Sequence, residues 1–292
     1  MKNKFTGTGV ALITPFNADF SVDYQSLKQI VDFIICGGVE YLVALGTTSE
    51  SATLDENEKR EVVKAILEAN ADRVPVVIGI GGNNTQSVIS QINKQDFTGI
   101  SGLLSVVPYY NKPQQGGMIA HFEAVADASP VPVILYNVPG RTAVNMKTET
   151  TIKLSKHPNI VSVKEASGDF MQIMQIIREK EAEFEVLSGD DALTLPLIAA
   201  GASGVISVTA NAFPYEFSEM VRLALNNEFA KAKELHYKLM KITELFFADG
   251  SPAGVKALLS MMGMCSEVVR LPLVNVNENI RNQIRDEYHR IK

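Results

Sequence analysis

The sequence contains no tryptophan, only two cysteines and only four histidines among its 292 residues. Cys36 and Cys265 cannot build a disulfide framework, so we expect each to be a small buried residue or a tolerated thiol. The histidines are scattered, without HExxH or similar spacing, which gives little support to a zinc site. We therefore expect no metal site.

An excess of positive charge and a long apolar run are also missing. The net charge of -6 and the pI of about 5.4 provide no general attraction to nucleic acid or to anionic lipid. No apolar run reaches the length of a membrane span, and the N-terminal MKNKFTGTGV develops no signal-peptide core. These features predict a cytoplasmic protein without nucleic-acid or membrane partners.

The chain does contain a regular alternation of apolar runs and helical patterns. Hydrophobic residues make up 46% and charged residues 21%, as in an ordinary globular protein. Short apolar runs predict strands over residues 7–16, 41–46, 74–81, 102–108, 131–138, 160–165, 184–189 and 204–210, and residues 166–168 end the sixth run. Helical spacing of apolar residues falls over 23–36, 55–70, 85–96, 116–128, 148–156, 170–180, 192–200 and 215–226.

Eight apolar strands, each followed by a helix, indicate a closed parallel sheet that is buried on both faces. This pattern predicts a (β/α)8 TIM barrel over residues 1–226. Three further helical patterns over 228–247, 252–262 and 276–291 predict a C-terminal helical domain over 227–292. An open doubly wound sheet is the alternative fold, which eight uninterrupted strand and helix units disfavour.

Lys164 is an unusual residue in the predicted sixth strand, which reads IVSVKEASG. A lysine that follows apolar strand residues can extend past the strand end into water, and this is the ordinary interpretation. The alternative is a desolvated lysine that acts as a neutral amine nucleophile towards a carbonyl. The rest of the chain must decide between these interpretations.

Polar residues recur at the C-terminal ends of the predicted strands. They are Thr47 and Thr48, Tyr109 and Tyr110, Tyr136 and Asn137, Lys164 and Glu165, and residues 188–191. In a barrel these ends meet on one face, where such enzymes build their sites. An amine, hydroxyls, phenols and the guanidinium of Arg141 form a set suited to a keto acid and a second carboxylate.

Each of these residues also has an ordinary interpretation. The threonines could serve turn chemistry, the tyrosines could pack a loop or a subunit contact, and Arg141 could be a solvated loop charge. For Asp190 and Asp191 we expect N-capping of the helix that begins at Ala192 rather than metal binding.

Five motifs resemble those of the dihydrodipicolinate synthase family, in the pyruvate-dependent class I aldolase superfamily that includes N-acetylneuraminate lyase. They are GTTSES at 46–51, VVPYYNKP at 106–113, YNVPGRT at 136–142, VKEASG at 163–168 and GVISV at 204–208. The similarity extends from Gly7 to about Ala212 and continues more loosely through the helical tail.

The resemblance implies a Schiff-base reaction without a metal or organic cofactor, because pyruvate forms a covalent imine with Lys164. The resulting enamine would add to L-aspartate 4-semialdehyde to give 4-hydroxy-tetrahydrodipicolinate, in the first committed step of the diaminopimelate and lysine branch. Matching positions imply a proton relay of Thr47, Tyr136 and Tyr110. They also imply four substrate-binding residues, namely Thr48 for the pyruvate carboxylate, Arg141 for the semialdehyde carboxylate, Ile206 and Gly189.

In the family Tyr110 reaches the neighbouring subunit's site, so the resemblance implies a homodimer with shared sites, and homotetramers are common. Some members are inhibited by lysine at an interface pocket. The matching positions are Ser51, Ala52, Glu56, Lys59, Asn83, Ser87 and Tyr109. Sensitive enzymes usually have a histidine at Lys59 and a glutamate at Ser87, so we expect weak or absent feedback here. Ser49, where the family often has glycine, is expected to be tolerated.

Two other functions remain open at this point. The chain could be a related pyruvate aldolase that acts on N-acetylneuraminate or a 2-keto-3-deoxy sugar acid. It could also be a barrel that has lost catalysis and serves as a regulatory or binding protein, although Thr47, Tyr110, Tyr136 and Lys164 are all present.

Overall fold

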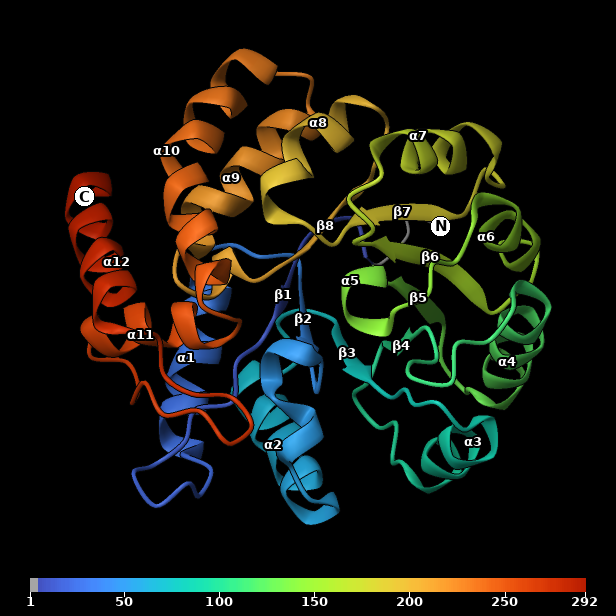
Figure 1. Cartoon of the computed structure of the whole chain (residues 1–292), viewed down its shortest axis with the longest axis horizontal. Helices are drawn as coiled ribbons and strands as arrows, with labels where there is room; N and C mark the ends of the chain where they lie inside the picture. The colour runs from blue at the N-terminus through green and yellow to red at the C-terminus, as the bar shows by residue number, and fades with distance from the viewer. Residues whose placement is uncertain (1–4) are drawn as a thin grey trace.

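The computed structural model describes residues 5–292 and contains a closed barrel of eight parallel strands in sequential order (Figure 1). The strands are β1 (Gly7–Ala11), β2 (Tyr41–Ala44), β3 (Val76–Gly79), β4 (Gly102–Val106), β5 (Val133–Asn137), β6 (Ile160–Glu165), β7 (Glu185–Ser188) and β8 (Gly204–Ser207). The barrel closes through pairing of β1 with β8. The predicted TIM barrel is confirmed, and the open doubly wound sheet is wrong.

Helices surround this barrel (Figure 1). They are α1 (Tyr24–Cys36), α2 (Glu56–Asn70), α3 (Thr85–Lys94), α4 (Gln115–Ala128), α6 (Thr148–Leu154), α7 (Phe170–Glu179), α8 (Thr194–Ala199) and α9 (Pro214–Leu225). Local chemistry sets where they begin. In α2, for example, the Asp55 side chain accepts hydrogen bonds from the backbone N–H groups of Asn57 and Glu58. The Glu58 side chain in turn accepts a hydrogen bond from the N–H of Asp55.

Short helical turns follow several strands at the C-terminal face of the barrel. They are α5 (Pro139–Thr142) and the 3₁₀ turns η1 (Thr47–Ser49), η2 (Ser51–Thr53), η3 (Asp191–Leu193) and η4 (Thr209–Asn211). The predicted strand over 7–16 is too long, since β1 ends at Ala11, whereas β6 ends at Glu165 as the sequence predicts. Apolar character continues into the loop after β1 because Leu12, Ile13 and Phe16 are buried there without pairing as a strand.

The alternation of side chains along the strands produces two hydrophobic cores. One lies inside the barrel and includes Val43, Leu104 and Ile206. The other lies between the strands and the surrounding helices and includes Val10 and Val163. Because successive strand residues face opposite sides, the neighbour of Val163 on β6 faces the barrel interior.

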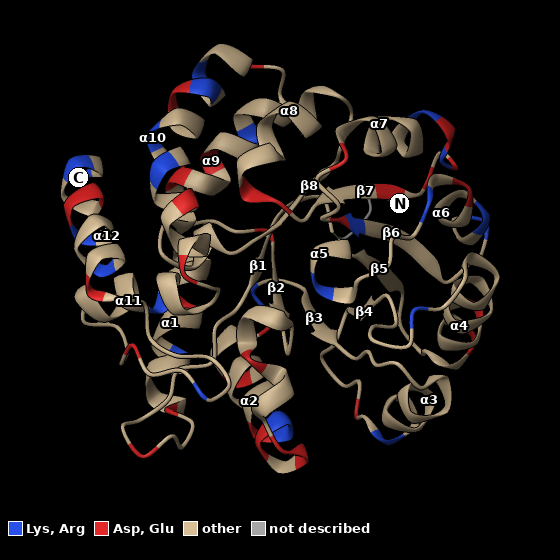
Figure 2. Ribbon diagram, viewed as in Figure 1, with Lys and Arg blue, Asp and Glu red and all other residues tan. Residues whose placement is uncertain are grey.

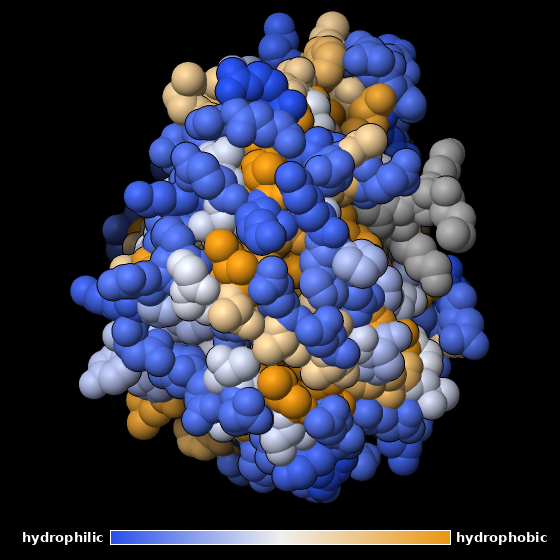
Figure 3. Space-filling model, turned by 90° about the vertical axis from the view of Figure 1, so that its right-hand side faces the viewer, coloured by the Kyte–Doolittle hydropathy of each residue, from blue (hydrophilic) through white to orange (hydrophobic). Residues whose placement is uncertain are grey.

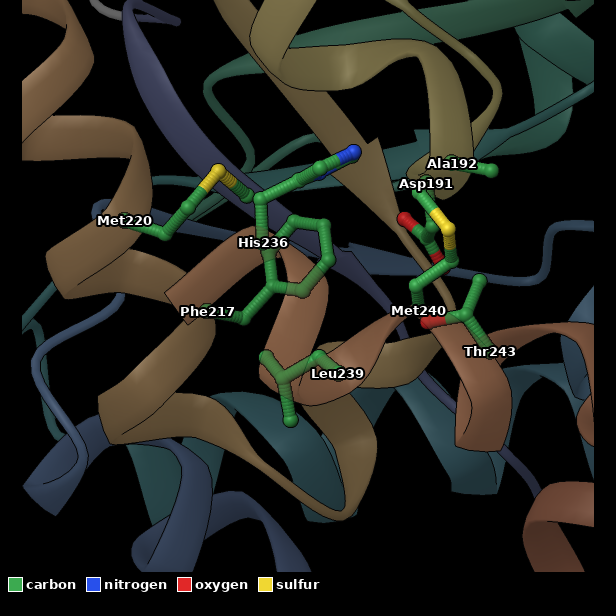
Figure 4. Close-up of a pocket in the computed structure, with 8 residues that line it drawn as sticks. All are labelled: Asp191, Ala192, Phe217, Met220, His236, Leu239, Met240 and Thr243. Carbon is green, nitrogen blue, oxygen red and sulfur yellow. The ribbon is translucent and has the colours of Figure 1, made fainter. Parts of the chain in front are cut away.

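The chain continues after the barrel as three helices, α10 (Phe229–Ala248), α11 (Ala253–Met261) and α12 (Glu278–Ile291). They lie on the side of the barrel that carries α1, α8 and α9 (Figure 1). A small cavity between α9, α10 and η3 is lined by Asp191, His236 and Thr243 among others (Figure 4). The division into domains at residue 226 stays a prediction.

Charged residues lie mainly on the outer helices and loops, with both signs intermixed (Figure 2). On the face shown in Figure 3, hydrophobic residues are interrupted by hydrophilic ones. Across residues 5–292 the structure contains no helix that is long and apolar enough to cross a membrane. The cytoplasmic location and the absence of nucleic-acid partners stay predictions.

Candidate active site

Lys164 and Tyr136 are cross-strand neighbours at the C-terminal ends of β6 and β5. The Nζ atom of Lys164 lies 4.3 Å from the centroid of the Tyr136 ring, and the two side chains are only 6% and 8% exposed. No ion pair of Lys164 occurs among residues 5–292. The lysine therefore does not extend into bulk water, and its amine is not neutralised by a carboxylate.

A buried hydrogen bond behind these residues joins the same two strands. The Asn137 side-chain amide donates to Glu165 Oε1 at 2.6 Å, and the Ser167 hydroxyl donates to Glu165 Oε2 at 2.5 Å. Burial raises the pKa of Glu165, which opposes ionisation. Because Asn137 pairs with Glu165 one position after Tyr136 pairs with Lys164, this contact fixes the register of the two candidate catalytic side chains.

The two candidate threonines lie in η1, directly after β2. Thr48 is buried and Thr47 is exposed. The turn is held from the side of β1, because the Ser49 hydroxyl donates to the Leu12 carbonyl at 2.7 Å and the Thr14 hydroxyl donates to the Ser49 carbonyl at 2.8 Å. Ser49 is thus accommodated by a specific hydrogen bond, and its loop is fixed relative to the barrel.

Ile206 lies on β8, and Gly189 directly follows the end of β7. Ile206 is 1% exposed and belongs to the same interior cluster as Tyr136. The Gly189 amide donates to the Glu165 carbonyl at 2.6 Å, and a Cβ at this position would lie 2.7 Å from that of Ala166. Glycine is therefore required for the close approach of the ends of β6 and β7.

Tyr110 and Arg141 are the outermost residues of the predicted site. Tyr110 is 85% exposed, and its backbone has a φ of 73°, in the left-handed region that a tyrosine rarely adopts. Arg141 is exposed on α5, the short helix after β5. This single chain brings Lys164, Tyr136 and Ile206 together in the barrel, whereas Tyr110 and Arg141 are exposed.

The capping expectation is confirmed for Asp190 and wrong for Asp191. The Asp190 side chain accepts from the N–H of Ala192 at 2.9 Å. Asp191 instead accepts from the N–H groups of Val208 and Thr209, at 3.0 and 2.8 Å, and burial raises its pKa. This carboxyl joins η3 to the end of β8, a contact that spacing along the chain could not reveal.

The residues predicted for lysine binding occupy η2, the first turns of α2 and α3, and two loops. Ser51 and Ala52 lie in η2, and Glu56 pairs with Lys59 at 2.8 Å on α2. On the neighbouring loops the Asn111 amide donates to the Asn83 carbonyl at 2.8 Å, next to Tyr109 and Tyr110. Ser87 is exposed on α3.

Sequence reasoning missed a buried ion pair next to the threonine turn. Glu50 follows η1, and its Oε1 lies 2.5 Å from Nζ of Lys256 on α11, with both side chains 0% exposed. One signal was available, because Lys256 is the only charged residue in the otherwise apolar helix AGVKALLSM. The partner could not be found from the sequence, since the two residues are 206 positions apart.

The cysteine expectation is met only in part. Cys36 is exposed, whereas Cys265 is half-buried and burial raises its thiol pKa to about 11. For the part of the chain described, no group of three or more His, Cys, Asp or Glu side chains is placed to hold a metal ion.

A (β/α)8 barrel with a buried lysine against a tyrosine at the C-terminal ends of adjacent strands has the architecture of a class I, Schiff-base aldolase. The family pattern of the dihydrodipicolinate synthetase family matches residues 4–290. The chain belongs to this family. The resemblance seen in the five motifs is confirmed, and the chain is an enzyme of the lyase type.

Three relatives illustrate the similarity. The 4-hydroxy-tetrahydrodipicolinate synthase of Flavobacterium psychrophilum is 55% identical over 281 residues, which cover 96% of each chain. The dihydrodipicolinate synthase structure from Aquifex aeolicus has a TM-score of 0.94 and 40% identity, and covers 98% of each chain. A monomeric dihydrodipicolinate synthase variant has a TM-score of 0.96 and 34% identity, and covers 99% of this chain and 97% of its own.

Proposed function

We propose that this enzyme condenses pyruvate with L-aspartate 4-semialdehyde to form 4-hydroxy-tetrahydrodipicolinate, with Lys164 as the Schiff-base residue. The Lys164 amine adds to the C2 carbonyl of pyruvate, and water leaves to form the imine. Loss of a methyl proton gives the enamine, whose carbon attacks the aldehyde carbon. The amino group of the semialdehyde then attacks the imine carbon, which closes the ring and releases Lys164, so the sum of the steps loses one water.

The observation that carries this proposal is the contact between the Lys164 amine and the Tyr136 ring, 4.3 Å apart in a buried part of the barrel. A nucleophilic lysine needs a site with little water and without a carboxylate partner. Its reaction also needs a nearby acid and base, because protons move in imine formation, in enamine formation and in the carbon–carbon bond-forming step. A phenol on the adjacent strand can supply this function.

The remaining assignments follow from the chemistry of the two substrates. Thr47 and Tyr110 would extend the proton relay from Tyr136, and Thr48 would hold the pyruvate carboxylate. The exposed guanidinium of Arg141 would bind the semialdehyde carboxylate, for which a planar bidentate donor is well suited. Ile206 and Gly189 would shape the cavity around the imine. No metal or organic cofactor is needed, because the imine itself accepts the electron pair that is released when the methyl proton is lost.

The test is to incubate the purified protein with pyruvate and borohydride, measure the intact mass and map the adduct. The same protein is then assayed with aspartate semialdehyde through a coupled reductase. We expect a reduced pyruvyl adduct on Lys164 together with turnover. An adduct without turnover of the semialdehyde would indicate a pyruvate aldolase of another specificity, and no adduct would overturn the Schiff-base role.

The exposure of Tyr110 supports a shared site in a homodimer. A phenol that is 85% exposed in one chain can contribute to catalysis only if something covers it. We propose that Tyr110 reaches the active site of a second copy, and that two such dimers form a tetramer.

Subunit mixing tests the shared site. Tyr110→Phe and Lys164→Met subunits, each nearly inactive alone, should regain up to about a quarter of wild-type activity after unfolding and joint refolding, because mixed dimers contain one complete site. Sedimentation velocity gives the assembly state. A fully active monomer, or no complementation in confirmed mixed dimers, would contradict the proposal.

Feedback by lysine should be weak. Lys59 is paired with Glu56 and presents a like charge to a lysine ligand, while Ser87 offers no anion. Inhibition assays should show less than half inhibition at about 1 mM lysine. Tighter binding of lysine would need a carboxylate partner in the pocket and no opposing ammonium. Half-inhibition by lysine below that concentration would contradict this proposal.

A further inference from the structure

The turn that carries Thr47 and Thr48 is held by a charge from the far end of the chain. Lys256 Nζ contacts Glu50 Oε1 at 2.5 Å, donates to the Val268 carbonyl at 2.9 Å and lies 4.2 Å from the centroid of the Phe16 ring. The other oxygen of Glu50 accepts from the backbone N–H of Arg270 at 2.9 Å. Both oxygens of the buried carboxylate are thus engaged by the segment that follows the barrel.

The side-chain contacts of Glu50 hold its backbone in an unusual conformation. Its φ of 52° lies in the left-handed region, and the residue stands between η1 and η2. A non-glycine residue is strained in this region and persists there only where its surroundings determine its conformation. The contacts with Lys256 and Arg270 are those surroundings.

Stability alone does not account for this pair. Taking two charges out of water costs several kcal/mol per ion, and apolar side chains of similar volume often stabilise a core as well. Burial lowers the pKa of Lys256, whereas Glu50 acts in the opposite direction. A pair with this cost is best explained by what it orients, and the residues next to Glu50 in the chain are those of the threonine turn.

The turn is held on its opposite side by the barrel itself. The hydroxyls of Ser49 and Thr14 fix it to the loop after β1, whereas Glu50 fixes it to α11 and the segment beyond. In Figure 1 the loop between α11 and α12 extends towards α2, consistent with the ion pair between Arg270 and Glu58 on that helix. The turn therefore lies between two anchors that belong to different parts of the chain.

We propose that Glu50 and Lys256 are positioning residues, through which the C-terminal helices set the conformation of the Thr47–Thr48 turn for catalysis. The inference rests on the proposed function, in which Thr47 relays protons and Thr48 binds the pyruvate carboxylate. Displacement of the turn should then change both kcat and the KM for pyruvate. A pair that only stabilised the fold would change neither value per folded active site.

The experiment compares Glu50→Gln, Lys256→Met and the double variant with the wild-type enzyme. The matched control is Glu58→Gln, which weakens the other tie of the same segment, on α2 rather than at the turn. Exhaustive pyruvate and borohydride trapping counts competent sites by intact mass. The kcat is expressed per trapped site, and the KM for pyruvate is measured on the same samples. We expect Glu50→Gln and the double variant to lose about 10- to 100-fold in kcat and to raise the pyruvate KM several-fold. Glu58→Gln should stay within about twofold of wild type.

The outcomes are distinguishable. Wild-type protein without an adduct or turnover would mean that the proposed function fails. Wild-type activity with unchanged kcat and KM in Glu50→Gln and the double variant would overturn the positioning role, as would an equal loss in Glu58→Gln. If Lys256→Met alone does not fold because Glu50 is left buried and unpaired, the double variant decides, since its neutral side chains remove that charge.

Discussion

Two lysines among residues 5–292, Lys164 and Lys256, are almost fully buried, and their surroundings differ in one respect. Lys164 and Lys256 each lie just over 4 Å from the centroid of an aromatic ring, at 4.3 Å from Tyr136 and 4.2 Å from Phe16. Lys256 is paired with Glu50 at 2.5 Å and also donates to a carbonyl. Within the described residues Lys164 has neither kind of partner.

Under the proposed function, this difference distinguishes a structural cation, Lys256, from the Schiff-base amine, Lys164. A carboxylate beside an ammonium holds it in the charged form and occupies its donors, so that nitrogen cannot attack a carbonyl. Lys164 contacts an aromatic ring without such a carboxylate, which is the arrangement that the proposed Schiff-base role requires. Burial by itself therefore does not mark a catalytic lysine, and the absence of a pairing carboxylate is the informative feature.

The largest expected effect is on activity. Lys164→Met should abolish the pyruvate adduct and lower kcat by about 10³-fold or more, because no other amine can form the imine. Its free energy of unfolding should change by less than about 1.5 kcal/mol, since no ion pair is broken and the volumes are similar. Intact mass after borohydride trapping and urea unfolding measure the two effects. Strong destabilisation by Lys164→Met would contradict the predicted difference in stability between the two lysine variants.

The reverse pattern is expected at the other lysine. Lys256→Met should lower the free energy of unfolding by about 3–5 kcal/mol, because it leaves the Glu50 carboxylate buried without a counter-charge. Adding Glu50→Gln should restore most of that loss. Urea unfolding of the two single variants and the double variant gives the coupling energy, and additive losses would show that the pair does not interact as described.

The aromatic partner of Lys164 gives a smaller effect. Tyr136→Phe keeps the ring but removes the hydroxyl, so kcat should fall about 10²-fold while the pyruvate adduct still forms. The matched control is Tyr41→Phe in the same interior cluster, which loses the hydrogen bond to the Val205 carbonyl. That control should cost about 1 kcal/mol of stability and leave kcat unchanged. Equal kcat in both variants would remove Tyr136 from the proton relay.

The smallest effect concerns Glu165, the residue after Lys164. Burial raises its pKa above the usual 4.5, so the folded state binds its proton more tightly than the unfolded state. The resulting stability is present at acidic pH and is lost as pH rises from about 4.5 through the raised pKa. Glu165→Gln keeps acceptors and donors for Asn137 and Ser167, so its stability should decline less over that range. Urea unfolding at several pH values measures the slopes, and parallel slopes would contradict the prediction.

Much of the site could be predicted from the sequence because it depends on local pattern. Lys164 and Tyr136 each end an apolar run, and parallel strands bring such ends to one face. Their direct contact agrees with that prediction. The roles of Asp191 and Glu50 could not be predicted in this way, because each depends on a partner from another element.

The sequence by itself determined the alternation of strands and helices, and with it the barrel and the face that carries Lys164. Period-two and helical hydrophobic patterns are properties of short segments, so they need no knowledge of distant residues. Only the tertiary structure decided which buried charges meet. Lys256 finds Glu50 across 206 positions because the C-terminal helices pack against the barrel. That packing, rather than any local signal, gives one buried lysine a carboxylate partner, whereas Lys164 has none among the described residues.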